Sequence, residues 1–334
     1  MPIVSVPKSG NLDQKFVTLV KQLREPLHKL GFGMYRGTAL DTLAYMETGD
    51  RSTAIVQQGV DIDDSGYRMV ALGKEATFDD YKAKVISECG YQRMDFWGKK
   101  WNRLMPEAEK RRVLASMSGL AEKPMVMPLL ECLELLRQGE TKTCLYDGKA
   151  FFHAAHLVDP TGADVADNQA PNLLTIDLDT AGWNTLLQTI IDRPDPGSKP
   201  SEDKVYLPNR LLNGDTLEIW TSQTEIFTEL SKIFDPKSVW ANSVANASEY
   251  RLRYAQATLQ MVPEMRAGHY FYAIVKTAPM RGIFARMPDA PDIDELKAGT
   301  DLWVKQKEML AHCFATFGCA YYFPFAIYKV KIGS

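Results

Sequence analysis

Apolar residues recur three or four positions apart near the start of the chain, in residues 11–30, which predicts one amphipathic helix. The stripe consists of Leu12, Phe16, Leu19, Leu23, Leu27 and Leu30. Asn11 and Gln14 resemble a capping box, and Gly31 is a natural stop. Pro26 is expected to kink the helix. Such a helix more often packs in its own core, and the alternative is an arm that lays its stripe on a neighbouring subunit.

The next segment, residues 45–100, is polar and rich in turn-forming residues. Its short apolar stretches, such as Ile55-Val56 and Met69-Val70-Ala71-Leu72, are separated by glycine and aspartate turns. This pattern predicts a long β-hairpin with little core of its own. A hairpin with so little apolar surface is marginal by itself, so we expect it to need a neighbouring surface.

Residues 106–138 carry the longest helical pattern in the chain. Pro106 suits the first helical position, and the pattern ends at Gly139. The apolar positions are Val113, Leu114, Met117, Leu120, Leu129, Leu130, Leu133 and Leu136. Pro124 and Pro128 are expected to bend or divide this helix.

Strand and helix patterns alternate in the second half of the chain. Strands are predicted at 172–178, 215–221, 269–275 and 320–332, and helices at 180–191 and 222–234. The last two strands are apolar on both faces, which is typical of strands that are covered on both sides. Pro324 indicates that the last strand lies at an edge or is bulged there. The spacing of Ser222 and Glu225 predicts a capping box for the second helix.

The composition narrows the class of protein. The chain has 334 residues and is 45% hydrophobic, which suits one large domain or two ordinary ones. Its 39 basic and 42 acidic residues give a net charge of −3, so no large field attracts nucleic acid or an anionic membrane. The five cysteines are odd in number and contain no C-x-x-C pair, which indicates reduced thiols. We expect no signal peptide and no membrane span, because a basic start followed by an apolar run is absent and the longest apolar run is about half of the ~20 residues needed.

The candidate chemistry lies in residues 146–159, YDGKAFFHAAHLVD. His153 and His156 would share one face of a helix, where a metal could bind. However, the stretch runs into a turn, and a third ligand of the kind that a catalytic zinc needs is not identifiable. Cys144 could act as a nucleophile beside His153, but no third member of such a triad is evident. There is also no H-E-x-x-H, Walker or G-x-S-x-G motif, so we expect no enzyme, no catalytic residue, no metal and no cofactor.

An ordered set of stretches resembles the Mu-like phage major head subunit, the major capsid protein of a tailed double-stranded DNA phage. The resemblance begins with PLLECLELLRQG and TCLYDGKAFFHAAHLV, that is, a leucine-rich helix ending at Gly139, then Tyr146-Asp147-Gly148, Phe151-Phe152 and His156. It continues with HYFYAIVKTAPMRGIFARM and AHCFATFGCAYYFPFAIYKVK, and it covers roughly residues 106–332. The family pattern does not require His153, WTSQTE replaces its proline-bearing turn, and residues 31–100 match poorly.

The resemblance implies an α+β chain with the Hong Kong 97-type phage capsid fold. Its parts would be an N-terminal arm at 1–44, an extended loop at 45–100, the peripheral-domain spine helix at 101–145, an axial domain at 146–261, and peripheral-domain strands with the C-terminus at 262–334. On this fold, neighbouring subunits would chiefly hold the helix at 11–30 and the extended loop. The turn at 146–159 would lead from the spine helix into the axial domain, with its aromatic residues packed and its histidines hydrogen-bonded locally.

The resemblance also implies a viral structural protein of a bacteriophage virion. Copies would self-assemble as hexamers and pentamers into the icosahedral capsid, with portal, scaffold and possible decoration proteins as further partners. Packaged double-stranded DNA would lie inside without sequence-specific binding, no membrane would be involved, and assembly would take place in the host bacterial cytoplasm. The alternatives are a soluble α/β hydrolase or metal-dependent enzyme using His153, His156 and Cys144, and an encapsulin-like shell protein.

Overall fold

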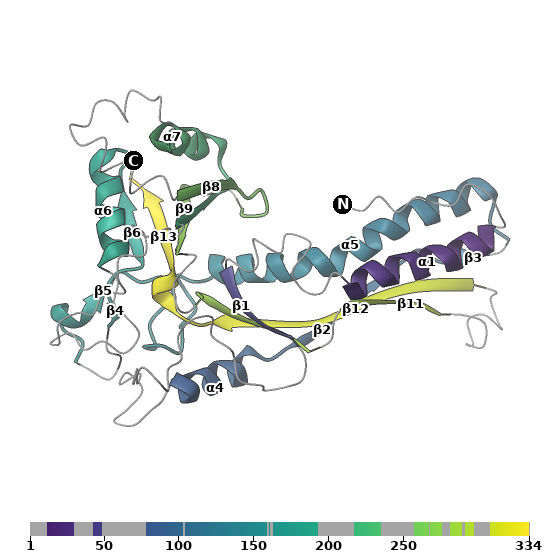
Figure 1. Cartoon of the computed structure of the whole chain (residues 1–334), viewed down its shortest axis with the longest axis horizontal. Coiled ribbons are helices and arrows are strands. Elements are labelled where there is room, and N and C mark those ends of the chain that lie inside the picture. Colours follow the sequence, from purple (N-terminus) through teal and green to yellow (C-terminus); the bar gives the residue numbers. More distant parts are fainter. Residues whose placement is uncertain are drawn as a thin grey trace.

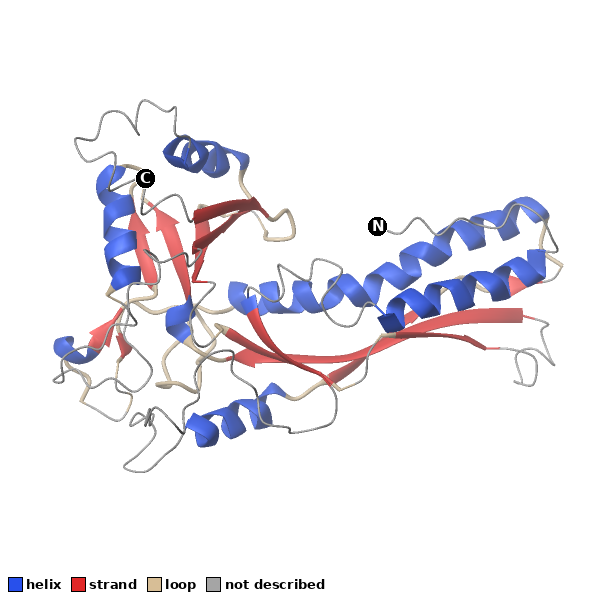
Figure 2. Ribbon diagram, viewed as in Figure 1, coloured by secondary structure: helices blue, strands red, loops and turns tan. Residues whose placement is uncertain are grey.

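The chain forms an elongated lobe and a compact lobe (Figure 1). The computed structural model describes residues 12–29, 43–48, 78–102, 104–158, 160, 163–192, 217–234, 257–266, 268–275, 281–288, 291–296 and 308–333. Among these residues, one six-stranded sheet belongs to the elongated lobe and one five-stranded sheet to the compact lobe. The two lobes differ in shape, and they meet at one end of the longest helix (Figure 2).

The elongated lobe is built on a helix and a strand that run side by side (Figure 1). Helix α5 (Glu107–Arg137) packs along strand β12 (Glu308–Tyr321), and helix α1 (Leu12–Lys29) packs on α5. In the six-stranded sheet, β12 pairs with four strands, namely β2 (Gln92–Trp97), β3 (Trp101–Asn102), β10 (Ile283–Met287) and β11 (Asp292–Leu296), all antiparallel. The remaining strand, β1 (Ala44–Thr48), pairs parallel with β10. The long strand therefore organises this lobe.

The compact lobe is a mixed sheet with helices beside it (Figures 1 and 2). Its strand order is β6 (Leu173–Ile176), β13 (Ile327–Ile332), β9 (Tyr270–Val275), β7 (Leu217–Thr221) and β8 (Ala257–Met261). Helix α6 (Thr180–Ile191) packs on β6, and helix α7 (Thr224–Phe234) packs on β7 and β8. A small antiparallel pair, β4 (His156–Leu157) and β5 (Gln169–Ala170), lies beside this lobe with the short 3₁₀ turn η3 (Ala166–Asn168).

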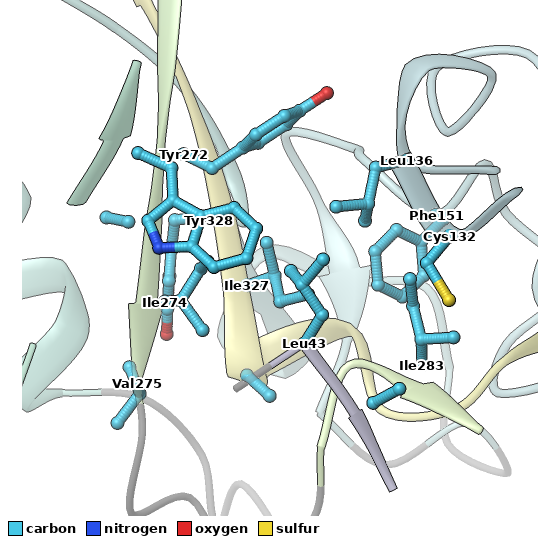
Figure 3. Close-up of a cluster of buried hydrophobic side chains, with 14 of the residues drawn as sticks. Leu43, Cys132, Leu136, Phe151, Tyr272, Ile274, Val275, Ile283, Ile327 and Tyr328 are labelled. Carbon is cyan, nitrogen blue, oxygen red and sulfur yellow. The ribbon is translucent and has the colours of Figure 1, made fainter. Parts of the chain in front are cut away.

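One hydrophobic cluster is shared by both lobes (Figure 3). It contains Ile283 of the elongated lobe, Ile274 and Ile327 of the compact lobe, and Leu136 of α5. Apolar burial is non-directional, so this shared core holds the lobes together without by itself fixing their angle. A second cluster lies under α1, where the helix meets α5, Trp101, Ile293 and Cys313.

The predicted helices and strands between residues 172 and 275 are confirmed in type and place. Strands form within 172–178, 215–221 and 269–275, and helices form at Thr180–Ile191 and Thr224–Phe234. The predicted capping box is wrong, because Gln223 and not Ser222 is the residue next to the helix, and the Ser222 hydroxyl donates to the carbonyl oxygen of Arg266 at 3.2 Å.

Helix α5 is continuous although it contains Pro124 and Pro128, so the expected division does not occur. Each proline removes one backbone hydrogen bond to the carbonyl four residues earlier. Both prolines are buried, and α5 is packed on β12 along the lobe. Tertiary packing of the helix offsets the lost bonds.

The hairpin expected at 45–100 is wrong for the residues that the structure describes. Strand β1 pairs with β10 and strand β2 with β12, and helix α4 (Phe78–Cys89) precedes β2. The helix buries Tyr81, Val85 and Cys89, which recur every four residues in a segment whose overall polarity hides them. Residues 49–77 lie outside the described part of the chain.

The expectation that neighbouring subunits chiefly hold the helix at 11–30 is also wrong for α1. Phe16, Leu19 and Leu23 are buried within their own subunit, in the cluster between α1, α5 and β11. The more ordinary interpretation, a helix in its own core, is confirmed.

The predicted strand at 320–332 is two strands in different sheets. A 3₁₀ turn, η5 (Pro324–Ala326), carries the chain from β12 in the elongated lobe to β13 in the compact lobe. Pro324 therefore marks a break, whereas β13 lies between β6 and β9 and is not an edge strand. The segment expected at 262–334 accordingly contributes β9 and β13 to one sheet and β10, β11 and β12 to the other.

Candidate functional site

The turn that follows α5 holds the residues singled out by sequence. It is not helical. The amide of Cys144 donates to the carbonyl oxygen of Lys149 at 2.8 Å, and the amide of Gly148 donates to the carbonyl oxygen of Cys144 at 3.1 Å. Gly148 has φ +73°, a left-handed conformation that suits glycine. His153 and His156 therefore do not share a helix face, and their ring centroids are 5.9 Å apart at an interplanar angle of 70°.

Aromatic side chains close this turn onto the end of α5. Phe151 and Phe152 are buried, and the amide of Phe152 donates to the carbonyl of Gly139 at 2.8 Å. A Cβ atom on Gly139 would lie 2.5 Å from the Phe152 ring, so only glycine permits this approach. The expected packing of the aromatic residues is confirmed.

Both ring nitrogens of His156 face oxygen atoms in a fully buried environment. Nδ1 lies 2.8 Å from Oδ2 of Asp147, and Nε2 lies 2.9 Å from the carbonyl oxygen of Phe151. A carbonyl oxygen only accepts hydrogen bonds, so Nε2 is the donor in that contact. The ring is therefore held on both sides, by the Phe151 carbonyl and by the Asp147 carboxylate.

Asp147 is ionised and saturated with donors. Besides His156, its carboxylate accepts from the amides of Leu157 at 2.9 Å and Lys149 at 3.0 Å. Burial raises the pKa of Asp147, but the hydrogen bonds from His156 and from these amides outweigh it and bring the pKa below its ordinary value. The two side chains thus form a buried pair whose hydrogen bonds are satisfied, which leaves no open position for a substrate.

Cys144 is not an activated nucleophile. Its sulfur lies 3.7 Å from Oδ1 of Asp147, and burial together with that carboxylate raises the pKa of the Cys144 thiol to about 12. Nucleophilic cysteines have depressed pKa values. This geometry opposes the hydrolase alternative, in which Cys144 would attack beside His153.

Cys144, Asp147 and His156 could also be considered as metal ligands, because their ligand atoms lie within 4.8 Å of one another. The donor set does not fit well, since both nitrogens of His156 and both oxygens of Asp147 are already committed to hydrogen bonds. His153 is outside the group, and its Nδ1 accepts from the amide of Ala155 at 3.1 Å. The local hydrogen bonding expected for the histidines is confirmed, and the absence of a metal stays a prediction.

Sequence analysis missed Asn172, whose side chain makes three hydrogen bonds beside the turn. It is fully buried, and its Nδ2 donates to the carbonyl oxygens of Phe151 at 2.7 Å and Pro324 at 2.9 Å. Its Oδ1 accepts from the amide of His153 at 2.9 Å. An asparagine before a strand carries no sequence signal for such a role, because its partners are distant in the sequence.

A second polar contact links the end of α5 to the compact lobe. Lys329 of β13 is buried, and its Nζ lies 2.7 Å from Oε1 of Glu140, while Nζ of Lys331 lies 2.5 Å from Oε2. Burial raises the pKa of Glu140, but the two lysines outweigh it and hold the pKa below its ordinary value. Lys329 also lies over the Tyr270 ring, 4.3 Å from its centroid.

A cleft of about 360 Å³ separates α5 from part of the compact lobe. Its walls are Leu130, Glu131, Leu133, Glu134 and Arg137 of α5, and Glu264, Met265, Arg266, Tyr270 and Tyr272 of the compact lobe. Glu134 is engaged by Arg137 and Gln138, whose hydrogen bonds lower the pKa of this carboxyl to about 2. The negative charge of Glu134 in the cleft wall is therefore already balanced by Arg137.

None of the described helices is long and apolar enough to cross a membrane.

No protein-family model and no curated protein matches the chain. Among solved structures, it is similar to the procapsid of bacteriophage JBD30, with 10% identity and a TM-score of 0.42 over 96% of this chain and 76% of that one. It is also similar to the mature capsid of bacteriophage PhiM1, with 8% identity and a TM-score of 0.39 over 73% and 71%. A structure of Mycobacterium phage Che8 has 11% identity and a TM-score of 0.35 over 72% and 70%. At such low identities and TM-scores, the function has to be argued from the chain itself.

Proposed function

We propose that this chain is the major capsid protein of a tailed bacteriophage, of the Mu-like type with the Hong Kong 97 fold. The observation that carries the proposal is the long helix α5 lying along the long strand β12, in an elongated lobe that projects from a compact α/β lobe (Figure 1). The sequence resemblance implies this pairing of a spine helix with long strands. The residues that carry the resemblance lie in both of these elements.

In this proposal the lobes take the places of the two domains. The elongated lobe is the peripheral domain with α5 as its spine helix, and the compact lobe is the axial domain. The compact lobe then consists of the 146–261 segment together with β9 and β13, because these strands pair with β6 and β7. The extended loop stays proposed at residues 45–100, of which residues 49–77 lie outside the described part of the chain.

The chemistry of the junction supports a structural role. The histidine, carboxylate and thiol that an enzyme would use are buried and hydrogen-bonded to one another and to the backbone. Groups committed in this way stabilise a fold but offer no open position for a substrate.

The surface of the elongated lobe supports self-association. Trp97 is 55% exposed and stacks on His312 with ring centroids 4.0 Å apart, and Leu104 is 85% exposed at the turn before α5. We propose that these two exposed apolar side chains take part in contacts between subunits, where their burial would be favourable. We propose that copies associate as hexamers and pentamers that close into an icosahedral shell.

The other partners follow from that role. Portal, scaffold and decoration proteins would join the shell, which assembles in the host bacterial cytoplasm and becomes part of the virion. The net charge of −3 suits a wall that encloses double-stranded DNA without gripping it.

Electron microscopy of the purified full-length protein tests the proposal. We expect shells, or hexameric and pentameric rings, that form as the protein concentration is raised. Trp97→Ser and Leu104→Ser should leave the subunit folded and raise the concentration needed for assembly, whereas Thr18→Ser on the exposed face of α1 is the matched control. A monomer at every concentration, or hydrolytic turnover that is lost in Cys144→Ser, would oppose it.

A further inference from the structure

Two stretches carry the chain between the lobes within the described residues. Residues 138–158 lead from the end of α5 toward the compact lobe, and residues 322–326 lead from β12 to β13. The chain also passes from β9 to β10, and Arg281 and Gly282 at the end of that passage accept from the amides of Phe323 and Tyr322 in the second crossing. The angle between the lobes therefore depends in part on how the first crossing is held relative to the second.

The side chain of Asn172 is bonded to both crossings. Its Nδ2 donates to the carbonyl of Phe151 in the first crossing and to that of Pro324 in the second. The Asn172 backbone adds one bond to the first crossing and one to β13, since its amide donates to the carbonyl of His153 at 3.1 Å and its carbonyl accepts from the amide of Lys329 at 2.9 Å. Asn172 thus connects the two crossings with strand β13 of the compact lobe.

His156 fixes the first crossing on which Asn172 acts. The Phe151 carbonyl accepts from both Asn172 and His156, which uses its two lone pairs. The other side of the His156 ring is held by Asp147, whose carboxylate also binds the amides of Lys149 and Leu157. The network therefore runs from the turn after α5, through Phe151 and Asn172, to the start of β13.

Packing does not fix the lobe angle on every side. On one side, α5 and the compact lobe line a cleft of about 360 Å³, with Met265 and Arg266 among its walls. Apolar burial is non-directional, whereas buried hydrogen bonds require defined distances and angles. Directional bonds at the crossings are the features that select one angle.

We propose that the network of Asn172, Phe151, His156 and Asp147 is a clamp that fixes the angle between the lobes, and thereby the curvature of the shell. The effect on curvature rests on the proposed capsid function, and the effect on the lobe angle does not. Asn172 is a positioning residue in this clamp, because it acts through the two carbonyl groups that it holds.

The test compares two buried asparagines. Asn172→Ala removes the bonds between the crossings, whereas Asn168→Ala removes a buried amide that donates to the nearby carbonyl of Ala163 at 3.0 Å. Because the chain has native cysteines, spin labels are attached through noncanonical amino acids that replace Lys21 of α1 and Asn184 of α6. The distance between the two labels then reports the arrangement of the lobes in free, full-length subunits. Both substitutions should lower the unfolding temperature, but only Asn172→Ala should lose the single narrow distance distribution.

The same variants then decide the consequence for assembly. Wild-type and Asn168→Ala subunits should form shells of one diameter, and Asn172→Ala should form shells of mixed diameter. A narrow, native distance distribution in Asn172→Ala, with only a lower unfolding temperature, overturns the clamp. If Asn172→Ala does not fold, Asn172→Leu, which keeps the volume and lacks the polar atoms without adding a charge, decides by the same distance measurement. Failure of the wild-type protein to form shells would count against the proposed function and leave the distance result standing.

Discussion

The ring of Phe16 in α1 packs against the indole of Trp101, with centroids 5.1 Å apart and planes inclined by 33°. Both side chains are fully buried. Trp101 belongs to β3, which pairs with β12, so this contact joins the N-terminal helix to the sheet of its own subunit. A second tie is the ion pair between Arg24 and Asp292 of β11, at 2.9 Å.

We predict that α1 contributes to the stability of the isolated subunit. Phe16→Ala removes a fully buried ring, which typically costs about 3–5 kcal/mol. Chemical unfolding of unassembled subunits should show this loss, while Thr18→Ala on the exposed face of the helix should change little. Equal stability of Phe16→Ala and wild type, with a defect only in assembly, would restore the interpretation of α1 as an arm for neighbouring subunits.

We predict that Asp147 makes the subunit sensitive to acid. Its pKa in the folded state lies below the ordinary value of about 3.9, so its contribution to stability is present above that value and is lost as the pH falls through the folded pKa. Asp147→Asn should be less stable at neutral pH and should lose less stability on acidification. Unfolding temperatures from pH 7 to pH 3 measure this, with exposed Asp167→Asn as control. Parallel pH profiles for wild type and Asp147→Asn would refute the prediction.

We predict that His156 and Asp147 stabilise the fold as a hydrogen-bonded pair. Removing one partner leaves a buried polar group without its hydrogen bond, which typically costs about 1–3 kcal/mol. His156→Ala should therefore be strongly destabilised, and the double variant His156→Ala with Asp147→Asn should recover part of the loss. His153→Ala is the control, since the His153 ring lies outside this pair. A double variant no more stable than His156→Ala would show that the pair is not coupled.

We predict that the cluster of Cys144, Asp147 and His156 holds no metal. Its nitrogen and oxygen atoms are committed to hydrogen bonds, so a zinc ion would have to break several of them to bind. Elemental analysis after incubation with zinc and removal of the excess should find no stoichiometric metal. One zinc ion per chain that disappears in His156→Gln would contradict this.

We predict that the buried thiols react slowly in the folded chain. Burial raises the pKa values of Cys144 and Cys313 to about 12, and in each case a nearby carboxylate adds to the effect. Alkylation at pH 8 requires the thiolate, so mass spectrometry should find modification first at Cys319, which is only partly buried. Unfolded chains should react at all five cysteines. Rapid modification of Cys144 in the folded state would reopen the nucleophile interpretation.

Local pattern was sufficient to predict the elements whose periodicity is strong. The helices at α1, α5, α6 and α7 have apolar stripes at helical spacing, and β7 and β9 are short apolar runs. The turn at Asp147-Gly148 and the local role of the histidines were also predictable, because the glycine and the missing third ligand are both visible in the sequence.

The sequence by itself determined these elements and a core large enough to bury them, and it left the partner of each apolar face open. Tertiary structure decided that α1 packs on its own subunit. An apolar stripe on a helix indicates that this face is buried, but it does not indicate which surface it packs against. It also decided that β12 and β13 belong to different sheets, because strand pairing joins residues far apart in the chain. For the same reason Asn172 became visible only in the fold: the carbonyl of Pro324, which its side chain binds, lies 152 residues away in sequence, and a hydrogen bond at that separation leaves no local pattern.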